Sequence, residues 1–294
     1  MLVRKGIIYV FPKFDSFLDI GIRIGGFGLA NCLFVISRAL IIANEHNYIL
    51  INPTWQRIGL GQYIRGEKDK RTYFRLFRKV GVKGLKKYLL IYFGKKVDSI
   101  NQYCEKRILP QIIVVKGLAD YFESLLPYQS MIKQWILNNA RTKSIINECD
   151  NYIGIHIRMG DYTQERRAPI DWYIDKILKI KYITQDRSEF MLFSDGMDEE
   201  LEDILKIDRV HKCYAGNALA DILSLSNCCF IIGSDSTFSG WAAFLGQKPA
   251  VFPKMHFGRV LINQENEIVL NNEDDFPINI KNYLKNKYNI EAVR

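Results

Sequence analysis

Apolar and polar residues follow one another in the second half of the chain in blocks that predict strands and helices in turn. Residues 152–157 form a short apolar run rich in β-branched residues, which is typical of a buried strand. Further strands are predicted at 190–193, 209–214, 229–232 and 248–252. Helices are predicted at 171–181, 198–205, 217–225, 239–245 and 276–288, the last with Asp275 as its N-cap. This alternation predicts a parallel sheet covered by helices.

The first half is less regular. A strand at 20–26 enters a glycine turn, and a helix at 30–45 and a strand at 48–52 follow, which again favours a parallel sheet. Gly26 and Gly28 resemble a phosphate-binding loop only loosely, and close packing of a strand against a helix explains them equally well. A strand is predicted at 111–117 and a helix at 127–140. The pattern then turns polar, so we predict domains at 1–147 and 148–275 and a C-terminal helix at 276–294.

Charge is concentrated in one segment. The chain of 294 residues is 48% hydrophobic and has a net charge of +9, which excludes a disordered chain and suggests acidic partners. Residues 57–96 carry thirteen Lys or Arg against two acidic residues, a balance of +11. Aromatic and aliphatic residues are interleaved with these charges. The mixture suits amphipathic helices on an anionic membrane surface, and it equally suits a solvated insertion whose apolar face packs on its own domain.

The cysteines and the N-terminus bear on location. Six cysteines are scattered without a C-x-x-C pair, so we expect reduced thiols and a cytoplasmic protein. The N-terminus lacks the pattern of a signal peptide. No window approaches the roughly 18 apolar residues that span a bilayer. We therefore expect a cytoplasmic protein, either soluble or peripheral on the inner face of the membrane.

Polar side chains gather where three predicted strands end. His156, Arg158 and Asp161 follow the strand at 152–157, Ser194 and Asp195 follow 190–193, and Ser234 to Thr237 follow 229–232. In open α/β sheets ligands bind beyond the carboxyl ends of the strands. An arginine there keeps its charge, and its planar fork matches phosphate oxygens. The alternative is a purely structural pair of Arg158 with Asp161.

Two further features suit a nucleotide. Ser236 and Thr237 stand where a helix begins, so hydroxyl and backbone N–H groups there could hold a phosphate, and simple N-capping is the alternative. Asp221 precedes Ser236 on or near the preceding helix. A carboxylate can accept from both the N1–H and the 2-amino group of guanine, although a surface role on the helix is the alternative.

These motifs resemble those of the α-1,2-fucosyltransferases, glycosyltransferase family 11, and their GDP-fucose-using relatives. Residues 154–162 look like the family's hallmark segment, Phe193-Ser194-Asp195 like its second motif, and Asp221 with residues 234–245 like its third. Residues 25–34 look like a divergent form of its N-terminal Gly-Asn-Gln-Phe stretch. The resemblance covers residues 20–45 and 150–255.

The sequence departs from the family pattern by one insertion and at four substituted positions. The N-terminal motif carries an apparent two-residue insertion, and Cys32 replaces the usual Gln. Met159 stands where a second Arg is common, Gly196 where a second Asp is common, and Gly240 replaces one of two aromatic residues. Residues 52–140 match no pattern.

The resemblance implies a GT-B architecture, in which two Rossmann-like domains face each other across a cleft and the C-terminal domain holds the GDP-sugar. It implies that Arg158 binds the diphosphate, that His156 and Asp221 address the nucleotide, and that a phosphate-side turn contributes. The implied donor-binding residues are His156, Arg158, Asp221, Ser236, Thr237, Phe238, Gly26 and Gly28. The implied catalytic residues are Arg158, Asp161 and Asp195, and the general base stays open among Asp161, Glu165 and Asp195. No aspartate pair has metal-ligand spacing, so neither a metal nor another cofactor is expected.

The function expected from this resemblance is inverting transfer of fucose from GDP-fucose to a hydroxyl of a glycan or of a lipid-linked oligosaccharide. The expected product is an α-1,2 linkage to galactose in surface polysaccharide or O-antigen. One alternative is a transferase for another GDP-sugar. A second alternative is a non-enzymatic basic protein that binds nucleotides or nucleic acid. A nucleic-acid partner is not expected, because no nucleic-acid-binding motif is recognised.

Overall fold

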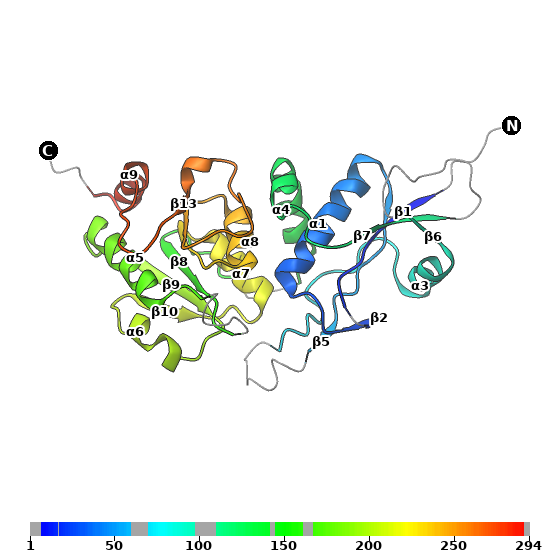
Figure 1. Ribbon diagram of the computed structural model, residues 1–294, viewed down its shortest axis with the longest axis horizontal. Helices are drawn as coiled ribbons and strands as arrows, with labels where there is room; N and C mark the ends of the chain where they lie inside the picture. The colour runs from blue at the N-terminus through cyan, green and yellow to red at the C-terminus, as the bar shows by residue number, and fades with distance from the viewer. Residues whose placement is uncertain are drawn as a thin grey trace. The chain divides into compact units, whose positions relative to one another are not determined.

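The chain forms two compact units (Figure 1). The computed structural model describes residues 7–16, 18–59, 70–97, 110–141, 145–160 and 167–290. Unit 1 comprises Met1–Tyr121 and Pro127–Arg141, and unit 2 comprises Phe122–Leu126 and Thr142–Arg294. Among the described residues no helix is both long and apolar enough to cross a membrane.

Unit 2 is built on one parallel sheet of six strands. They are β8 (Tyr152–Ile157), β9 (Glu189–Ser194), β10 (Val210–Cys213), β11 (Phe230–Ile232), β12 (Ala250–Phe252) and β13 (Glu267–Val269). Their order across the sheet is β10-β9-β8-β11-β12-β13. Numbered within the unit this is 3-2-1-4-5-6, the strand order of the Rossmann fold, whose ligands bind where the order reverses. That reversal falls between β8 and β11.

Helices cover both faces of this sheet. α5 (Ile170–Ile183) packs against α6 (Glu202–Leu205) and α9 (Ile278–Lys287), and α7 (Ala218–Asn227) packs against α8 (Thr237–Gly246). A short 3-10 turn, Glu199–Leu201, leads into α6, and a second one, Gln264–Asn266, leads into β13. Side chains of a strand alternate between faces. In β8 the isoleucines therefore join the core beneath α5, while His156 faces α7 and α8.

Unit 1 has a parallel sheet of four strands in the order β4-β1-β7-β6. They are β1 (Ile8–Pro12), β4 (Ile49–Leu50), β6 (Lys95–Val97) and β7 (Gln111–Val115). The described helices of this part of the chain are α1 (Leu29–Glu45), α3 (Gly84–Phe93) and α4 (Gln129–Asn139), the last preceded by the 3-10 helix Glu123–Tyr128. A separate small sheet contains β2 (Leu18–Ile20), β3 (Ile22–Ile24) and β5 (Arg57–Ile58).

Three predicted elements differ in the structure. The strand predicted at 20–26 is not part of the parallel sheet, because β2 and β3 pair antiparallel as a hairpin of their own. The strand that precedes α1 in the sheet is β1, which the pattern did not predict. Helix α9 begins at Ile278 with Pro277 as N-cap, so Asp275 is not the cap. Within the described part of 57–96 a single helix, α3, is present.

The predicted α/β class with two Rossmann-like domains is confirmed. Each unit is a parallel sheet carrying helices, and two such domains are the components of a GT-B architecture. The sheet of unit 2 also places β8 between β9 and β11, so the three strand ends that carry polar side chains are neighbours.

Candidate active site at the strand ends of unit 2

An arginine–carboxylate pair joins the ends of β8 and β9. Arg158 Nη1 lies 2.5 Å from Asp195 Oδ2, and the two side chains are 16% and 18% exposed. The register of the two strands sets Ile157 opposite Ser194, so the residues that follow each strand meet. The pair lies at the strand end, where the partly open guanidinium can be shared with an anion.

Asp195 also shapes the turn after β8. Its Oδ1 accepts the backbone N–H of Met159 at 2.8 Å and that of Gly160 at 3.2 Å. Ser194 Oγ donates to the carbonyl of Ile157 at 2.8 Å, which ties the same two strands together. Both carboxylate oxygens of Asp195 are therefore engaged. This suits a residue that orients Arg158 better than one that takes up a proton.

His156 is buried on the face of β8 that lies opposite the isoleucine side chains of this strand. It stands beside the point between β8 and β11 where the strand order reverses. Its Nδ1 lies 2.6 Å from Ser239 Oγ and 2.9 Å from Ser234 Oγ, and its ring stacks on Phe238 with centroids 4.4 Å apart. Ser234 follows β11, while Phe238 and Ser239 lie in the first turn of α8. His156 therefore fixes the start of α8 against β8.

The sequence analysis missed two members of this cluster. Ser239 Oγ also accepts the backbone N–H of Ser234 at 3.0 Å. Tyr173 of α5 is buried and hydrogen-bonds to Ser234. Ser239 lies three residues after the cap Ser236 inside an apolar helix, so the sequence carries no signal that separates it from an ordinary helix residue.

Burial keeps His156 neutral. Loss of hydration lowers the pKa of His156 to about 3, with Arg158 adding to the shift and Asp195 opposing it. Burial likewise raises the pKa of Tyr173 well above its usual value, against the effect of its hydrogen bond to Ser234. The cluster is thus a set of neutral hydrogen-bonding groups, and the charged pair beside it is Arg158 with Asp195.

The helix start predicted as a phosphate site begins at Thr237. Ser236 is its N-cap and is buried, and its hydroxyl accepts the backbone N–H of Phe238 at 3.3 Å. N-capping is therefore present, and it is compatible with phosphate at the same helix end. Asp235 accepts from both the backbone and the ring of His256, at 2.9 and 2.7 Å. Burial would raise the pKa of Asp235, but His256 holds it below its usual value.

Asp221 lies in the first turn of α7, after β10. The helix is capped by Asn217, whose side chain accepts from Leu219 and Ala220. Asp221 Oδ1 accepts the backbone N–H of Ala215 at 2.6 Å. Asp221 is half-buried, so its carboxylate closes the turn between β10 and α7 at the same edge of the sheet as Arg158.

The remaining predicted residues lie elsewhere. Gly26 and Gly28 belong to unit 1, where Gly28 is the N-cap of α1. Gly26 has φ +76°, and a Cβ there would lie 1.7 Å from the carbonyl oxygen of Asp15, so close backbone packing alone requires a glycine. Asp161 and Glu165 lie outside the described residues.

Two departures from the family pattern lie close together. A Cβ at Gly196 would lie 2.9 Å from Met159 Cγ, and Met159 is buried in the core beneath α5. Met159 therefore leaves little room for a side chain at position 196. A Cβ at Gly240 would lie 2.8 Å from Phe122 Cε2. Phe122 occupies the space that a larger residue at 240 would fill.

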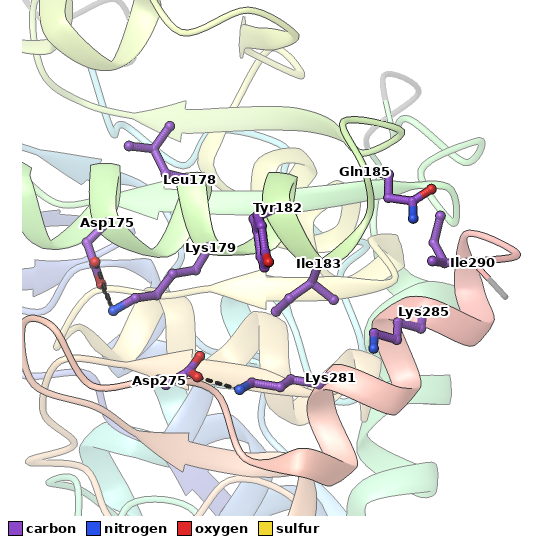
Figure 2. Close-up of a pocket in the computed structure, with 10 residues that line it drawn as sticks. All are labelled: Asp175, Leu178, Lys179, Tyr182, Ile183, Gln185, Asp275, Lys281, Lys285 and Ile290. Carbon is purple, nitrogen blue, oxygen red and sulfur yellow. Dashed lines mark hydrogen bonds and ion pairs between the residues drawn. The ribbon is translucent and has the colours of Figure 1, made fainter. Parts of the chain in front are cut away.

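A separate hollow of the described structure lies away from these strand ends. Within the described ranges no group of three or more His, Cys, Asp or Glu side chains could hold a metal ion. A hollow of about 710 Å³ lies between α5 and α9 (Figure 2). Its ion pairs, Asp175 with Lys179 and Asp275 with Lys281, satisfy four of its charged side chains. None of the candidate residues lines this hollow. The candidate site therefore rests on the side chains at the strand ends and not on a hollow.

Comparison with known proteins adds a family. The model of the family described as Glycosyl transferase family 11 matches residues 128–253, so the resemblance inferred from the motifs is confirmed there. The match covers less than half of the chain and contains Arg158, Asp195, Asp221 and Ser236. It does not extend to Gly26 and Gly28. A search of curated proteins finds no match.

Solved structures of low identity also match. A mutant of FUT1 from Arabidopsis thaliana in complex with GDP is 14% identical, with 85% of this chain and 71% of that chain covered and a TM-score of 0.49. The NodZ α-1,6-fucosyltransferase co-crystallised with GDP is 13% identical, with 84% and 94% covered and a TM-score of 0.48; NodZ comes from Bradyrhizobium. Likenesses at this level do not identify a substrate.

Proposed function

We propose that this protein is an inverting glycosyltransferase that transfers fucose from GDP-fucose to a hydroxyl of a glycan. The observation that carries the proposal is the Arg158–Asp195 pair at the end of β8, inside the region that matches glycosyl transferase family 11. It lies beside the point where the strand order of a Rossmann-like sheet reverses, which is where such sheets bind nucleotides.

Arg158 acts on the leaving group. When the bond between fucose and GDP breaks, negative charge develops on the β-phosphate, and a preorganised arginine stabilises that charge more than it stabilises the ground state. Asp195 holds the guanidinium at 2.5 Å, so the fork does not have to be ordered when the donor binds. The start of α8, at the neighbouring strand end, supplies backbone N–H groups. Like Arg158, these groups present positive charge to a phosphate.

The other residues have supporting roles in this proposal. His156 positions the start of α8, because its Nδ1 is used by Ser234 and Ser239. Asp221 reads the guanine through its carboxylate. Ser236, Thr237 and Phe238 form the phosphate-side turn, and the family resemblance alone adds Gly26 and Gly28 as donor-binding residues. Asp161 and Glu165 are the candidates for the base that deprotonates the acceptor hydroxyl, since Asp195 is already engaged.

The acceptor side rests on the family resemblance alone. We propose galactose as the acceptor sugar and an α-1,2 linkage, within a surface polysaccharide or a lipid-linked oligosaccharide made in the cytoplasm. A transferase for another GDP-sugar is the nearest alternative, because Arg158 and Asp221 would recognise the nucleotide and not the sugar.

A binding panel followed by an activity assay tests the proposal. We expect GDP to raise the melting temperature more than UDP, ADP or duplex DNA does. Slow release of fucose from GDP-fucose should follow, faster than release of mannose from GDP-mannose, and EDTA should leave it unchanged. Galactose-terminated glycans should accelerate GDP release.

Three results would contradict the proposal. Stabilisation by DNA and not by GDP would favour a nucleic-acid-binding protein. Equal turnover of GDP-mannose would remove fucose as the specific donor. Complete loss of activity in EDTA, restored by Mn²⁺ or Mg²⁺, would show that a metal takes part.

A further inference from the structure

Helix α3 in unit 1 has the reverse of the usual distribution of apolar and charged residues. Its one fully buried side chain is a lysine: Lys87 is 4% exposed and donates to Thr54 Oγ1 at 2.7 Å. Leu90 and Ile91 share this inward side and pack on the core formed by β1 and β7. The helix lies beside β6, the edge strand of the unit 1 sheet (Figure 1).

The outward side of α3 is apolar. Leu85, Leu89, Tyr92 and Phe93 are 75%, 49%, 82% and 66% exposed. Spacings of four, three and one residues place them on one side of a helix. The rings of Tyr92 and Phe93 contact each other edge to face, with centroids 4.9 Å apart. We call these four residues the outer face of α3. A contiguous exposed apolar face marks a surface that something covers.

The residues around this face are basic. Lys83, Lys86 and Lys96 are exposed beside it, and Arg75, Arg78 and Lys79 are exposed in the segment that leads to α3. Residues 70–97 contain no Asp or Glu. A protein partner would have to bring a complementary acidic rim, whereas an anionic lipid headgroup layer supplies negative charge and an apolar interior together.

We propose that the outer face of α3 and its surrounding lysines bind the surface of an anionic lipid bilayer. Leu85, Leu89, Tyr92 and Phe93 enter the boundary between headgroups and acyl chains, where aromatic rings are favoured. The lysines keep their charged ends among the headgroups. The helix lies in the plane of the surface and does not cross it. This inference stands on unit 1 alone and does not depend on the proposed function.

Co-sedimentation of the full chain with vesicles tests the inference. We expect pelleting with phosphatidylcholine vesicles that contain about 30% phosphatidylglycerol, and little with pure phosphatidylcholine. Binding should fall steeply as salt is raised to about 0.5 M, because the screening length becomes short compared with the distance between charges and headgroups.

Two variants separate the apolar from the charged contribution. Leu85→Ser, Leu89→Ser, Tyr92→Ser and Phe93→Ser together should lower partitioning by about tenfold or more. The triple variant Lys83→Gln, Lys86→Gln and Lys96→Gln should lower it by about a hundredfold, since each basic residue contributes about fivefold. Lys87 is left unchanged because it is buried.

Matched controls change the same number of exposed side chains elsewhere. Leu178, Tyr182, Met197 and Ile278 are 51%, 87%, 59% and 72% exposed in unit 2, and their joint replacement by Ser should leave partitioning within about twofold. The exposed lysines Lys116, Lys206 and Lys248 serve as the charge control. Their replacement by Gln should lower partitioning much less than the triple variant that includes Lys83 does.

Three outcomes would overturn the inference. The first is absence of pelleting by the wild type at low salt, and the second is pelleting that the α3 variants leave unchanged. The third is a wild-type dimer in sedimentation velocity that the Ser variant dissociates, because the face would then join two copies of the chain. GDP binding, measured on the same samples, should be retained in every variant. Failure of the wild type to bind GDP would count against the proposed function and not against this inference.

Discussion

At the scale of single residues, the proposed role of Asp195 is to orient the guanidinium of Arg158. If Asp195 orients Arg158, Asp195→Asn should lower kcat/KM about tenfold, because the amide keeps the contact to the turn but loses the charge-assisted bond to the guanidinium. The pH profile of kcat/KM should keep its shape. If Asp195 were instead the base, the variant would lose the acid limb of the profile and far more activity.

The burial of His156 predicts a stability that depends on pH. Its pKa is about 3 in the folded protein and 6.5 for an exposed imidazole. Between these values the unfolded chain binds the extra proton, so stability falls as pH falls below 6.5, by up to about 1.4 kcal/mol per pH unit. Urea unfolding at pH 7, 6 and 5 measures this.

The control for this pH dependence is the substitution of His156 itself. His156→Gln should reduce the slope of stability against pH, because glutamine takes up no proton in this range. Equal slopes for the wild type and His156→Gln would contradict the burial of a neutral imidazole.

Asp221 should account for the preference of the protein for GDP over ADP. Asp221→Asn keeps an oxygen for the N–H of Ala215, so the turn before α7 should stay intact, but guanine would lose one of two acceptors. We expect GDP affinity to fall about tenfold, as for a hydrogen bond to a charged group, and ADP affinity to stay unchanged. Calorimetric titrations with both nucleotides measure this, and equal wild-type affinities for GDP and ADP would remove the role.

Some site residues could be predicted from sequence and others could not. Arg158, Asp195 and Ser236 follow apolar strand segments directly, so their place at strand ends followed from the pattern. Ser239 and Tyr173 could not be assigned, because a serine and a tyrosine inside apolar helices read as ordinary helix residues. Their contacts with Ser234 depend on which strands are neighbours. The close approach of Met159 to Gly196 required the same knowledge.

At the scale of elements, β8 is held closely against α7. A Cβ at Gly154 would lie 2.4 Å from Leu225 Cδ1 and 2.9 Å from Cys228 Sγ. Gly154→Ala should therefore destabilise the protein by about 1–3 kcal/mol through overpacking. Chemical unfolding measures this loss. Adding Leu225→Val should recover part of it, and an unchanged unfolding midpoint in Gly154→Ala would contradict the close packing.

Regular elements were predictable where periodicity was strong. The alternation in unit 2 identified β8, β9, β11 and β12 within a few residues because each is an apolar and largely buried run. β10 was identified as well, although only Val210 of its four residues is buried. β1 was missed although all five of its residues are buried. β13 was missed as well, since it has three residues and only its central one is buried. The outward apolar face of α3 was one of the two alternatives that the pattern left open, because periodicity shows that a helix has two sides but not which one is buried.

At the scale of the whole molecule, the two units differ in how firmly their roles are supported. Unit 2 contains most of the family match, the Rossmann-like strand order and the candidate donor site. Unit 1 has a parallel sheet of the same kind, with the glycine turn and the basic helix α3. The donor site in unit 2 is therefore the central claim, and recognition of the acceptor is expected of unit 1.

The most direct test is calorimetric titration of GDP into the wild type, Arg158→Ala and Arg158→Lys. Arg209→Ala is the matched control, because Arg209 pairs with Glu189 at 3.2 Å at the opposite edge of the same sheet, where β9 and β10 begin. We predict a loss of about 2–4 kcal/mol of GDP binding in Arg158→Ala, partial recovery in Arg158→Lys, and wild-type affinity in Arg209→Ala. GDP affinity that is unchanged in Arg158→Ala would contradict a donor site at this strand end.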